Sequence, residues 1–312
     1  MRAPEFPGNL EWLNSEPLKL ADLLSAKKLV MIDFWTYSCV NCLRTIPHLS
    51  EWQKKYDSTT LTTSGSDGLV IIGAHTPEFE FEKKKENVEV ALKNLEVTWP
   101  VVLDPDYKIW HLYANSYWPR KFLINPKSEI VYDHIGEGGY AETENKIVEE
   151  LIKINPMLKL RRLDYDVEGR SGSSERQTGV CYPQTPELYL GNVRGNVIYP
   201  DTGGESYDSV YLDGDWKIEN EHIESVGPGY IRLIFRGVEV NLVMEAEEKI
   251  KISLELDGKP AREIEVKEPK MYNLVKLEQP PWDGNEQVGG ELKIHVPKNG
   301  LRAYALTFGG CV

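Results

Sequence analysis

The chain has 312 residues, of which 41% are hydrophobic and 27% charged, a composition typical of a globular protein with room for two domains. No apolar run approaches the roughly 18 residues that a membrane span needs, and the formal net charge of -13 disfavours nucleic acid and anionic lipid as partners. The positive start, apolar stretch and cleavage site of a signal peptide are missing. We therefore expect either a cytoplasmic protein or one whose leader has been removed.

The first half of the chain alternates β-branched runs with amphipathic stretches, the pattern of a largely parallel sheet covered by helices. The predicted order of elements is β-α-β-α-β-β-α. Strands are expected at residues 29–35, 69–75, 101–104, 121–125 and 130–136, and helices at 39–56, 79–94 and 142–154. Residues 1–158 are therefore predicted to form an α/β domain.

The composition changes after this domain. Residues 159–184 are first basic and then small and polar, as in a linker. Residues 185–312 consist of closely spaced alternating strands, with two-residue turns expected at Asp213-Gly214 and Asp257-Gly258. Strands are predicted here at 209–212, 230–235, 238–244, 250–256 and 302–308. This half is predicted to be an all-β sandwich of the jelly-roll type.

A Cys-x-x-Cys motif lies where the first long strand gives way to a helix. Cys39 would stand at the helix N-terminus, where unpaired backbone N–H groups and the helix dipole stabilise a thiolate. Cys42, one turn further on, is close enough to attack a mixed disulfide formed by Cys39. We predict a dithiol/disulfide exchange centre with Cys39 as nucleophile and Cys42 as resolving thiol, without metal or cofactor. The alternative is half of a structural zinc site, but no second pair of ligands stands at the required spacing.

The segment around this motif resembles the thioredoxin superfamily, whose strand reads D-F-W-x-x-x-C-x-x-C. The matching residues are Asp33, Phe34, Trp35, Cys39 and Cys42. The resemblance implies a thioredoxin-like fold in which Asp33 is buried behind the cysteines and helps to move the proton of Cys42. An ordinary carboxylate at a strand end is the alternative. The dipeptide Val40-Asn41 differs from the Gly-Pro of thioredoxin itself, so the resemblance does not give the direction of electron flow.

A second landmark is Pro119, which stands where this superfamily keeps a cis-proline before a sheet strand. The resemblance implies that Pro119 packs beside the cysteines and leaves the preceding backbone free to pair with a substrate. Trp118 would then shape a substrate groove, with a core tryptophan as the alternative. His75 and Glu78 follow another strand at the edge where active-site loops collect, although an exposed loop pair fits equally well. The candidates for substrate binding are Trp35, Trp118, His75 and Glu78.

Further strings are similar to the DipZ-type branch of the TlpA-like thioredoxins over nearly the whole chain. They are Ala3-Pro4-Glu5-Phe6, Trp35-Thr36-Tyr37-Ser38-Cys39, His75-Thr76-Pro77-Glu78-Phe79, Tyr117-Trp118-Pro119, Gly136-Glu137-Gly138-Gly139, Thr185-Pro186-Glu187-Leu188-Tyr189-Leu190-Gly191 and Thr307-Phe308-Gly309. The resemblance implies a β-sandwich similar to carbohydrate-binding modules, and a membrane electron-transfer protein of the CcdA type as partner. It also implies a place outside the cytoplasm, in the periplasm or cell envelope.

The β half carries two further candidate features. Four aromatic residues are candidates for stacking on sugar rings, although aromatic residues in strands are more often core: Trp216, Tyr230, Tyr272 and Trp282. Cys181 and Cys311 bracket this half, and we expect a disulfide between them. Such a bond would stabilise by about 5 kcal/mol at most and would indicate an oxidising compartment or a hyperthermophile's cytosol. Two free, buried thiols are the alternative.

The functional prediction is a thiol-disulfide oxidoreductase that acts on protein disulfides. One alternative is a non-catalytic sugar-binding or adhesion protein on a thioredoxin-like scaffold. The other is a peroxiredoxin-type peroxidase, but Ile32 occupies the proline position of its P-x-x-x-T-x-x-C pattern. A neighbouring thiol would also capture at once the sulfenic acid that a peroxidase must accumulate.

Overall fold

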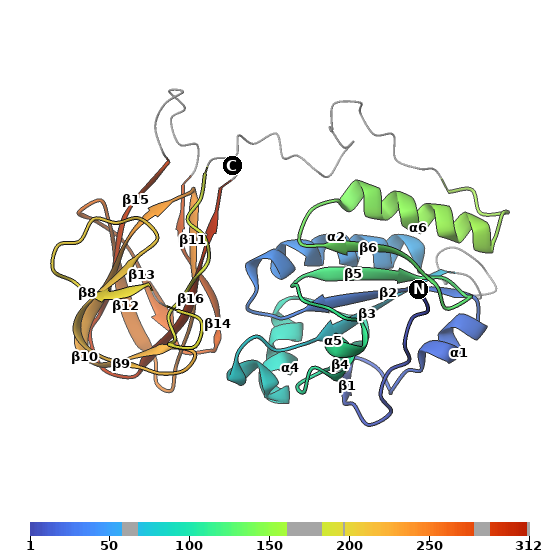
Figure 1. Cartoon of the computed structure of the whole chain (residues 1–312), viewed down its shortest axis with the longest axis horizontal. Coiled ribbons are helices and arrows are strands. Elements are labelled where there is room, and N and C mark those ends of the chain that lie inside the picture. Colours follow the sequence, from blue (N-terminus) through green and yellow to red (C-terminus); the bar gives the residue numbers. More distant parts are fainter. Residues whose placement is uncertain (58–67, 161–182, 196, 278–287, 311–312) are drawn as a thin grey trace. The chain divides into compact units, whose positions relative to one another are not determined.

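The computed structural model describes residues 1–57, 68–160, 183–195, 197–277 and 288–310. The chain divides into two compact units, Met1–Arg176 and Gln177–Val312, each with its own sheet (Figure 1). The predicted thioredoxin-like α/β domain followed by an all-β domain is confirmed. The limits of the linker, residues 159–184, stay a prediction. No helix in the described part of the chain is long and apolar enough to cross a membrane.

The first unit is built on a six-stranded sheet in the order β1-β4-β3-β2-β5-β6. Its strands are β1 (Trp12–Leu13), β2 (Lys28–Trp35), β3 (Gly68–His75), β4 (Val101–Leu103), β5 (Arg120–Ile124) and β6 (Ile130–Ile135). Strands β2, β3 and β4 run parallel, whereas β1, β5 and β6 are antiparallel to their neighbours. Strand β2 is buried beyond its first residue, as expected for a parallel strand with both faces covered.

Helices cover both faces of this sheet (Figure 1). On one face, α2 (Val40–Tyr56) and α6 (Tyr140–Ile154) lie side by side. The opposite face packs against α1 (Leu20–Ser25) and α5 (Lys108–Leu112). Alternate residues of β2 therefore face different layers: Ile32 and Phe34 point to α1 and α5, and Asp33 points to α2.

The single helix predicted at 79–94 is wrong, because the structure has a 3-10 helix, η1 (Glu80–Lys83), followed by α4 (Lys85–Asn94). The chain between them is extended at Lys84, with φ -76 and ψ 117. Asn87 Nδ2 donates to the carbonyl oxygen of Phe81 at 2.8 Å. The same carbonyl oxygen accepts from Lys84 N at 3.4 Å, the backbone bond that ends η1.

The second unit is a ten-stranded sheet that curls around one hydrophobic core. The main path is β13-β12-β15-β10-β16-β11-β14, with β7 paired to β16, β9 to β10 and β8 to β9. Among the described strands of this unit, only β8 and β9 form a parallel pair. The strands are β7 (Leu188–Tyr189), β8 (Ile198–Pro200), β9 (Val210–Ile218), β10 (Ile223–Arg236), β11 (Glu239–Ala246), β12 (Ile250–Leu256), β13 (Lys259–Val266), β14 (Lys270–Lys276), β15 (Gly289–Val296) and β16 (Leu301–Gly309).

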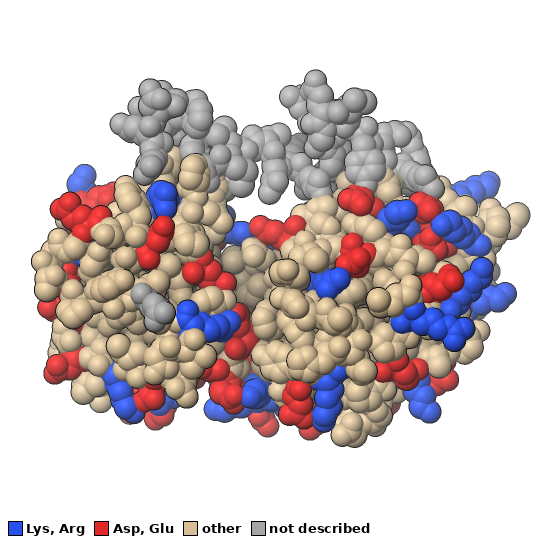
Figure 2. All heavy atoms as spheres, viewed as in Figure 1, with Lys and Arg blue, Asp and Glu red and all other residues tan. Residues whose placement is uncertain are grey.

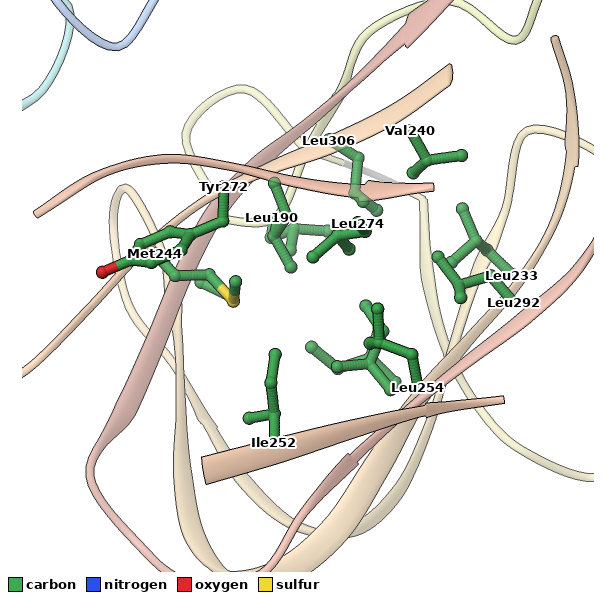
Figure 3. Close-up of a cluster of buried hydrophobic side chains, with 14 of the residues drawn as sticks. Leu190, Leu233, Val240, Met244, Ile252, Leu254, Tyr272, Leu274, Leu292 and Leu306 are labelled. Atoms are coloured by element: carbon green, nitrogen blue, oxygen red, sulfur yellow. The ribbon is translucent and has the colours of Figure 1, made fainter. Parts of the chain in front are cut away.

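The core of this unit draws side chains from strands on opposite sides of the curl (Figure 3). Leu233 of β10, Met244 of β11, Ile252 of β12 and Leu306 of β16 point toward one another there. In β12, Lys251 next to Ile252 is exposed, as period-two alternation requires. This arrangement is the filled interior that the alternating pattern predicts.

One of the two expected turns is confirmed and the other is wrong. Asp257-Gly258 joins β12 to β13. Asp213-Gly214 instead lies inside β9, opposite Gly229 and Tyr230 of β10, next to an irregularity in strand pairing. Gly214 has a φ of +87, and a Cβ there would lie 2.6 Å from the carbonyl oxygen of Pro228. The glycine is therefore needed for a close approach of two strands.

Acidic and basic side chains are interspersed on the visible face of each unit (Figure 2). In the β unit, Lys249, just before β12, pairs with Glu265 of β13 at 2.6 Å, and Lys251 of β12 pairs with Glu263 of β13 at 2.5 Å. Strand β13 ends the main path of the sheet and also carries Pro260. Charges and a proline on an edge strand oppose pairing with another chain.

Candidate active site

Three segments meet at the carboxyl end of β2. The first follows β2 and leads into α2, the second follows β3, and the third precedes β5. Trp118 Nε1 donates to the carbonyl oxygen of Thr76 at 3.0 Å, which joins the third segment to the second. Ser38 Oγ donates to Glu82 Oε1 at 2.6 Å, which joins the first segment to η1. The predicted redox motif therefore lies where these segments converge.

The two cysteines differ in exposure. Cys39 is the N-cap of α2 and partly exposed, and its Sγ accepts a hydrogen bond from Cys42 N at 3.4 Å. Cys42 is 2% exposed. Burial, followed by the hydrogen bond and charge of Cys39, raises the pKa of Cys42 well above its ordinary value. Cys39 is thus the thiol that a substrate can reach, and Cys42 needs a proton acceptor to react.

Asp33 and Lys121 form a buried pair of opposite charges behind the cysteines. They lie opposite each other in the register of β2 and β5, and they are 3% and 1% exposed. Burial raises the pKa of Asp33 to about 7, against the opposing charge of Lys121. The pKa of Lys121 is lowered, because the effect of burial exceeds the opposing effect of the negative charges of Asp33 and Cys42. Asp33 Oδ1 has no hydrogen-bond partner among the described residues, so it can accept a proton.

Two of the substrate-binding candidates lie in the interior. Trp35 and His75 are 2% and 1% exposed, and their rings meet edge to face with centroids 5.4 Å apart. His75 Nε2 is 3.4 Å from Thr36 Oγ1, and its ring stacks on Tyr37. Burial lowers the pKa of His75 to about 3, so its ring is neutral at physiological pH. Trp35 and His75 therefore pack in the interior against the segment that leads from β2 to Cys39.

The other candidates lie nearer the surface. The Trp118–Pro119 peptide bond is cis, as the resemblance implies. Trp118 is partly buried, and its ring packs on Trp110 at a centroid distance of 4.2 Å. No hydrogen bond within the described residues uses the main-chain groups of Trp118. Glu78 is partly buried, and its N–H donates to Glu82 Oε2 at 2.6 Å.

Sequence reasoning missed Lys121 and Glu82. Lys121 is a charged residue directly before the apolar run Phe122-Leu123-Ile124, which is a detectable but weak signal. Glu82 belongs to no motif considered above, and its burial results from tertiary packing. Both residues can be found only once the pairing of β5 and the path of η1 are known.

The remaining candidates belong to the β unit or lie outside the described residues. Tyr272 is part of the core, whereas Tyr230 faces outward and donates to Asp201 Oδ2 at 2.9 Å. Trp216 packs against the core and donates to the carbonyl oxygen of Asp213 at 2.8 Å. These three aromatic residues do not form a common stacking surface. The residues outside the described part are Trp282, Cys181 and Cys311. In the described part of the chain, no group of His, Cys, Asp and Glu could hold a metal ion.

Comparisons with known proteins cover both units. A family model described as thioredoxin-like matches residues 27–130, and one described as thioredoxin-like C-terminal domain matches residues 185–309. The chain is 31% identical to protein DipZ of Mycobacterium tuberculosis over 325 residues, which is 98% of this chain and 43% of DipZ. It therefore spans less than half of that relative's length.

Two other relatives match the first unit. NHL repeat-containing protein 2 of Bos taurus is 38% identical over 136 residues, which is 43% of this chain and 18% of that protein. Thiol-disulfide oxidoreductase YkuV of Bacillus subtilis is 24% identical over 144 residues, which is 46% of this chain and 90% of YkuV.

Proposed function

The chain belongs to the thioredoxin superfamily, in its DipZ- and TlpA-like branch, and from that premise we propose that it is a protein disulfide oxidoreductase. The observation that carries the proposal is the geometry of the cysteine pair. A partly exposed Cys39 caps α2, Cys42 lies buried beside it, and the Asp33 carboxyl lies behind Cys42.

The exchange needs two steps, and each makes and breaks one sulfur bond. First, the Cys39 thiolate attacks a substrate disulfide, which forms a mixed disulfide and releases one substrate sulfur as a thiolate that takes up a proton. Then Asp33 accepts the proton of Cys42, whose thiolate attacks Cys39 Sγ. The second substrate sulfur leaves, the Cys39–Cys42 disulfide forms, and two electrons have passed to the substrate. The reverse sequence oxidises a substrate dithiol.

The raised pKa of Cys42 gives these steps their order. Two of its causes are the hydrogen bond and the charge of Cys39. Both disappear when Cys39 enters the mixed disulfide, so Cys42 becomes a better acid only after a substrate is attached. Asp33, with a pKa raised to about 7, is then an acceptor matched to neutral pH.

The substrate is proposed to lie along the segment before β5. Pro119 offers no N–H group, and its carbonyl oxygen accepts from Gly136 N at 2.8 Å. The main-chain groups of Trp118 are the ones available to an extended peptide. This mode of binding depends on hydrogen bonds to the main chain of the substrate more than on its side chains, so it suits a range of protein substrates.

The partners and the compartment are proposals from the resemblance to DipZ-type proteins. We place the protein outside the cytoplasm, in the periplasm or cell envelope, with a CcdA-type membrane protein exchanging electrons with Cys39 and Cys42. A redox titration of this pair sets the direction of electron flow. A potential near that of thioredoxin, about -270 mV, indicates a reductase, and one near that of DsbA, about -120 mV, an oxidase.

Carbohydrate binding is a secondary proposal for the β unit, supported by its resemblance to carbohydrate-binding modules. Titration calorimetry with cell-wall oligosaccharides and the full chain tests it. If the chain binds sugar but does not reduce disulfides, the non-catalytic alternative replaces the proposed function.

Reduction of insulin disulfides tests the proposed function directly. We expect Cys39→Ser to abolish reduction, because no thiolate starts the exchange. Cys42→Ser should accumulate substrates as mixed disulfides that run as larger species on non-reducing gels, because no second thiol resolves them. Near-normal turnover in Cys39→Ser would contradict the proposal.

A further inference from the structure

One buried carboxyl group ties the chain just before Cys39 to the loop after β3. Glu82 of η1 is 1% exposed. Its Oε1 accepts hydrogen bonds from Ser38 N at 3.2 Å and from Ser38 Oγ at 2.6 Å. Its Oε2 accepts from Glu78 N at 2.6 Å and from Phe79 N at 3.1 Å. The exchange reaction as proposed above does not use this group.

We propose that Glu82 is a positioning residue for the Cys39 thiol, that it acts through Ser38, and that it does so as a carboxylate. The inference rests on the proposed function, because it concerns the nucleophile of that reaction. The reactivity of the Cys39 thiol can be measured without any substrate protein.

The contact controls the peptide unit that leads into the helix N-cap. Cys39 has φ -79 and ψ 116, and its carbonyl oxygen accepts from Leu43 N at 3.0 Å. In this conformation its Sγ also reaches the N–H group of Cys42. Holding the Ser38 N–H group restricts rotation just before Cys39. The sulfur therefore stays at the helix N-terminus, where a thiolate is stabilised.

The contacts favour the ionised form of Glu82. Three of its donors are the backbone N–H groups of Ser38, Glu78 and Phe79, which can only donate, and the fourth is the Ser38 hydroxyl. A protonated Glu82 can donate its O–H group to Ser38 Oγ, but its bonds from the three N–H groups then lose the assistance of the negative charge. Protonation of Glu82 therefore weakens the hold on Ser38.

The surroundings place this change near neutral pH. Burial raises the pKa of Glu82 to about 7, against hydrogen bonds from Ser38 and Thr36 that lower it. Glu78 is the titratable group that acts on it, and its charge raises the pKa further. His75, which contacts Thr36 and stacks on Tyr37, has a neutral ring.

Two effects of the carboxylate on Cys39 oppose each other. Its negative charge disfavours a thiolate nearby, whereas its hydrogen bonds hold the thiolate at the helix end. The four donors already disperse the charge, so we expect positioning to dominate. Removing the charge of Glu82 should raise the reactivity of Cys39 if repulsion dominates and lower it if positioning dominates.

The test is the rate at which iodoacetamide alkylates Cys39 between pH 5 and 10. All variants carry Cys42→Ser, so that Cys39 is the single thiol of the tryptic peptide quantified by mass spectrometry. We expect the parent to show a second step near neutral pH in addition to thiol ionisation. Glu82→Gln should lose that step and react about tenfold more slowly at pH 8, the effect of one charge-assisted hydrogen bond.

Ser38→Ala keeps the charge of Glu82 and removes the hydroxyl donor, so it should also slow alkylation. The double variant should lose less than the product of the two single effects, because both act along one route. Glu80→Gln, on the same η1 but exposed, is the matched control and should follow the parent at every pH.

Equal or faster alkylation in Glu82→Gln would overturn the proposal, as would independent effects in the double variant. If Glu82→Gln fails to fold by circular dichroism, Ser38→Ala alone decides: parental rates across the pH range overturn the proposal. Failure of insulin reduction with a normal alkylation profile would reject the proposed function and leave the role of Glu82 standing.

Discussion

At the scale of single residues, an unpaired oxygen is the notable property of Asp33. A buried carboxyl group normally has its acceptors filled, because an unpaired polar atom in the interior costs about 1–3 kcal/mol. Asp33 Oδ1 has no partner within the described residues, and Lys121 offers charge from the adjacent strand. An oxygen left open beside Cys42 suits transient acceptance of a proton, at a cost to stability.

Asp33→Asn is expected to slow turnover and to stabilise the first unit. The amide cannot take the proton of Cys42, which reduces the rate about 10²–10⁴-fold for lost general base catalysis. Burial raises the pKa of Asp33 from 3.8 to about 7, so its ionisation lowers the free energy of unfolding. This loss of stability is absent below pH 3.8, grows between pH 3.8 and pH 7, and is constant above pH 7. The variant should therefore gain up to about 4 kcal/mol at pH 8 and little at pH 4.

Urea unfolding at the two pH values, together with insulin reduction, checks both halves of this prediction. Asp106→Asn, a change at an exposed carboxylate that pairs with Lys108, is the control. A loss of stability at pH 8 would mean that Asp33 is a structural group and not a proton acceptor.

The sequence allows prediction of the residues whose role follows from local spacing. Cys39 and Cys42 lie on one helical turn, and the motif itself places Asp33 two residues before Trp35. Lys121 and Glu82 act through partners 88 and 44 residues away, as the pairings with Asp33 and Ser38 show. Nothing in the local sequence encodes those distances, because strand register and the burial of a charge are set by tertiary packing.

At the scale of elements, Glu144 joins α2 and α6. It is 6% exposed and accepts hydrogen bonds from Trp52 Nε1 at 3.3 Å and from Tyr56 Oη at 2.6 Å, and it pairs with Lys55. Burial raises the pKa of Glu144, but the bonds from Lys55 and Tyr56 outweigh it and the net pKa is lowered. One carboxylate therefore fixes the helix that carries Cys39 to its neighbour.

Glu144→Ala should destabilise the first unit by roughly 2–3 kcal/mol at pH 7, because two buried donors lose their acceptor. The depressed pKa means that the stabilisation is present above pH 4.5 and is lost as the pH falls further. Hydrogen exchange of α2 and α6 amides measures the effect. Glu149→Ala removes partly exposed ion pairs on the same helix and should cost less than about 1 kcal/mol. Equal losses in both variants would contradict the assignment.

The β unit has a comparable junction at Arg232. Its guanidinium makes a two-pronged contact with Asp201, at 2.8 and 2.7 Å, and a third bond to Glu291 at 2.9 Å. The side chains of Arg232 and Asp201 are each 7% exposed. The hydrogen bond from Arg232 holds the pKa of Asp201 far below its usual range. The segment after β8 is thus fastened to the middle of β10.

Arg232→Met should cost about 3–5 kcal/mol, because it leaves the Asp201 carboxylate buried without its cation. Arg302→Met is the matched control, since its partners Glu224, Glu245 and Glu247 are all more exposed than Asp201 and its loss should cost less than about 1 kcal/mol. Hydrogen exchange of peptides from β9 and β10 reports the difference. Protection that is unchanged in Arg232→Met would show that strand pairing alone holds this region.

Elements were predictable where periodicity is strong and were missed where a side chain ends the regular pattern. Strand β2 and helix α2 follow directly from their apolar runs. At the break at Lys84 the Phe81 carbonyl oxygen accepts from both Lys84 N and Asn87 Nδ2, and the Asp213-Gly214 pair serves a close strand approach in place of a turn. In both places the same residues fit two local structures, and distant packing decides between them.

At the scale of the whole molecule, the pair Cys181 and Cys311 stays a prediction, because both lie outside the described residues. The family model of the second unit ends at residue 309 and begins at 185, so the two cysteines flank it. In the Cys39→Ser, Cys42→Ser background, we expect no free thiol under denaturing, non-reducing conditions and a monomeric mass. Two titratable thiols in air-oxidised protein would contradict the bond, and with it one argument for an oxidising compartment.

The place of β16 in the second sheet bears on the order in which the two units acquire their structure. Strand β16 is the last described strand, yet it lies between β10 and β11 and also pairs with β7. The sheet of the first unit, in contrast, needs no residue beyond β6. During synthesis the first unit can therefore fold while the second still lacks an inner strand. Until β16 arrives, β10 and β11 expose hydrogen-bonding edges, so shortening the chain before Leu301 should expose the unit to aggregation and proteolysis far more than shortening an outer strand.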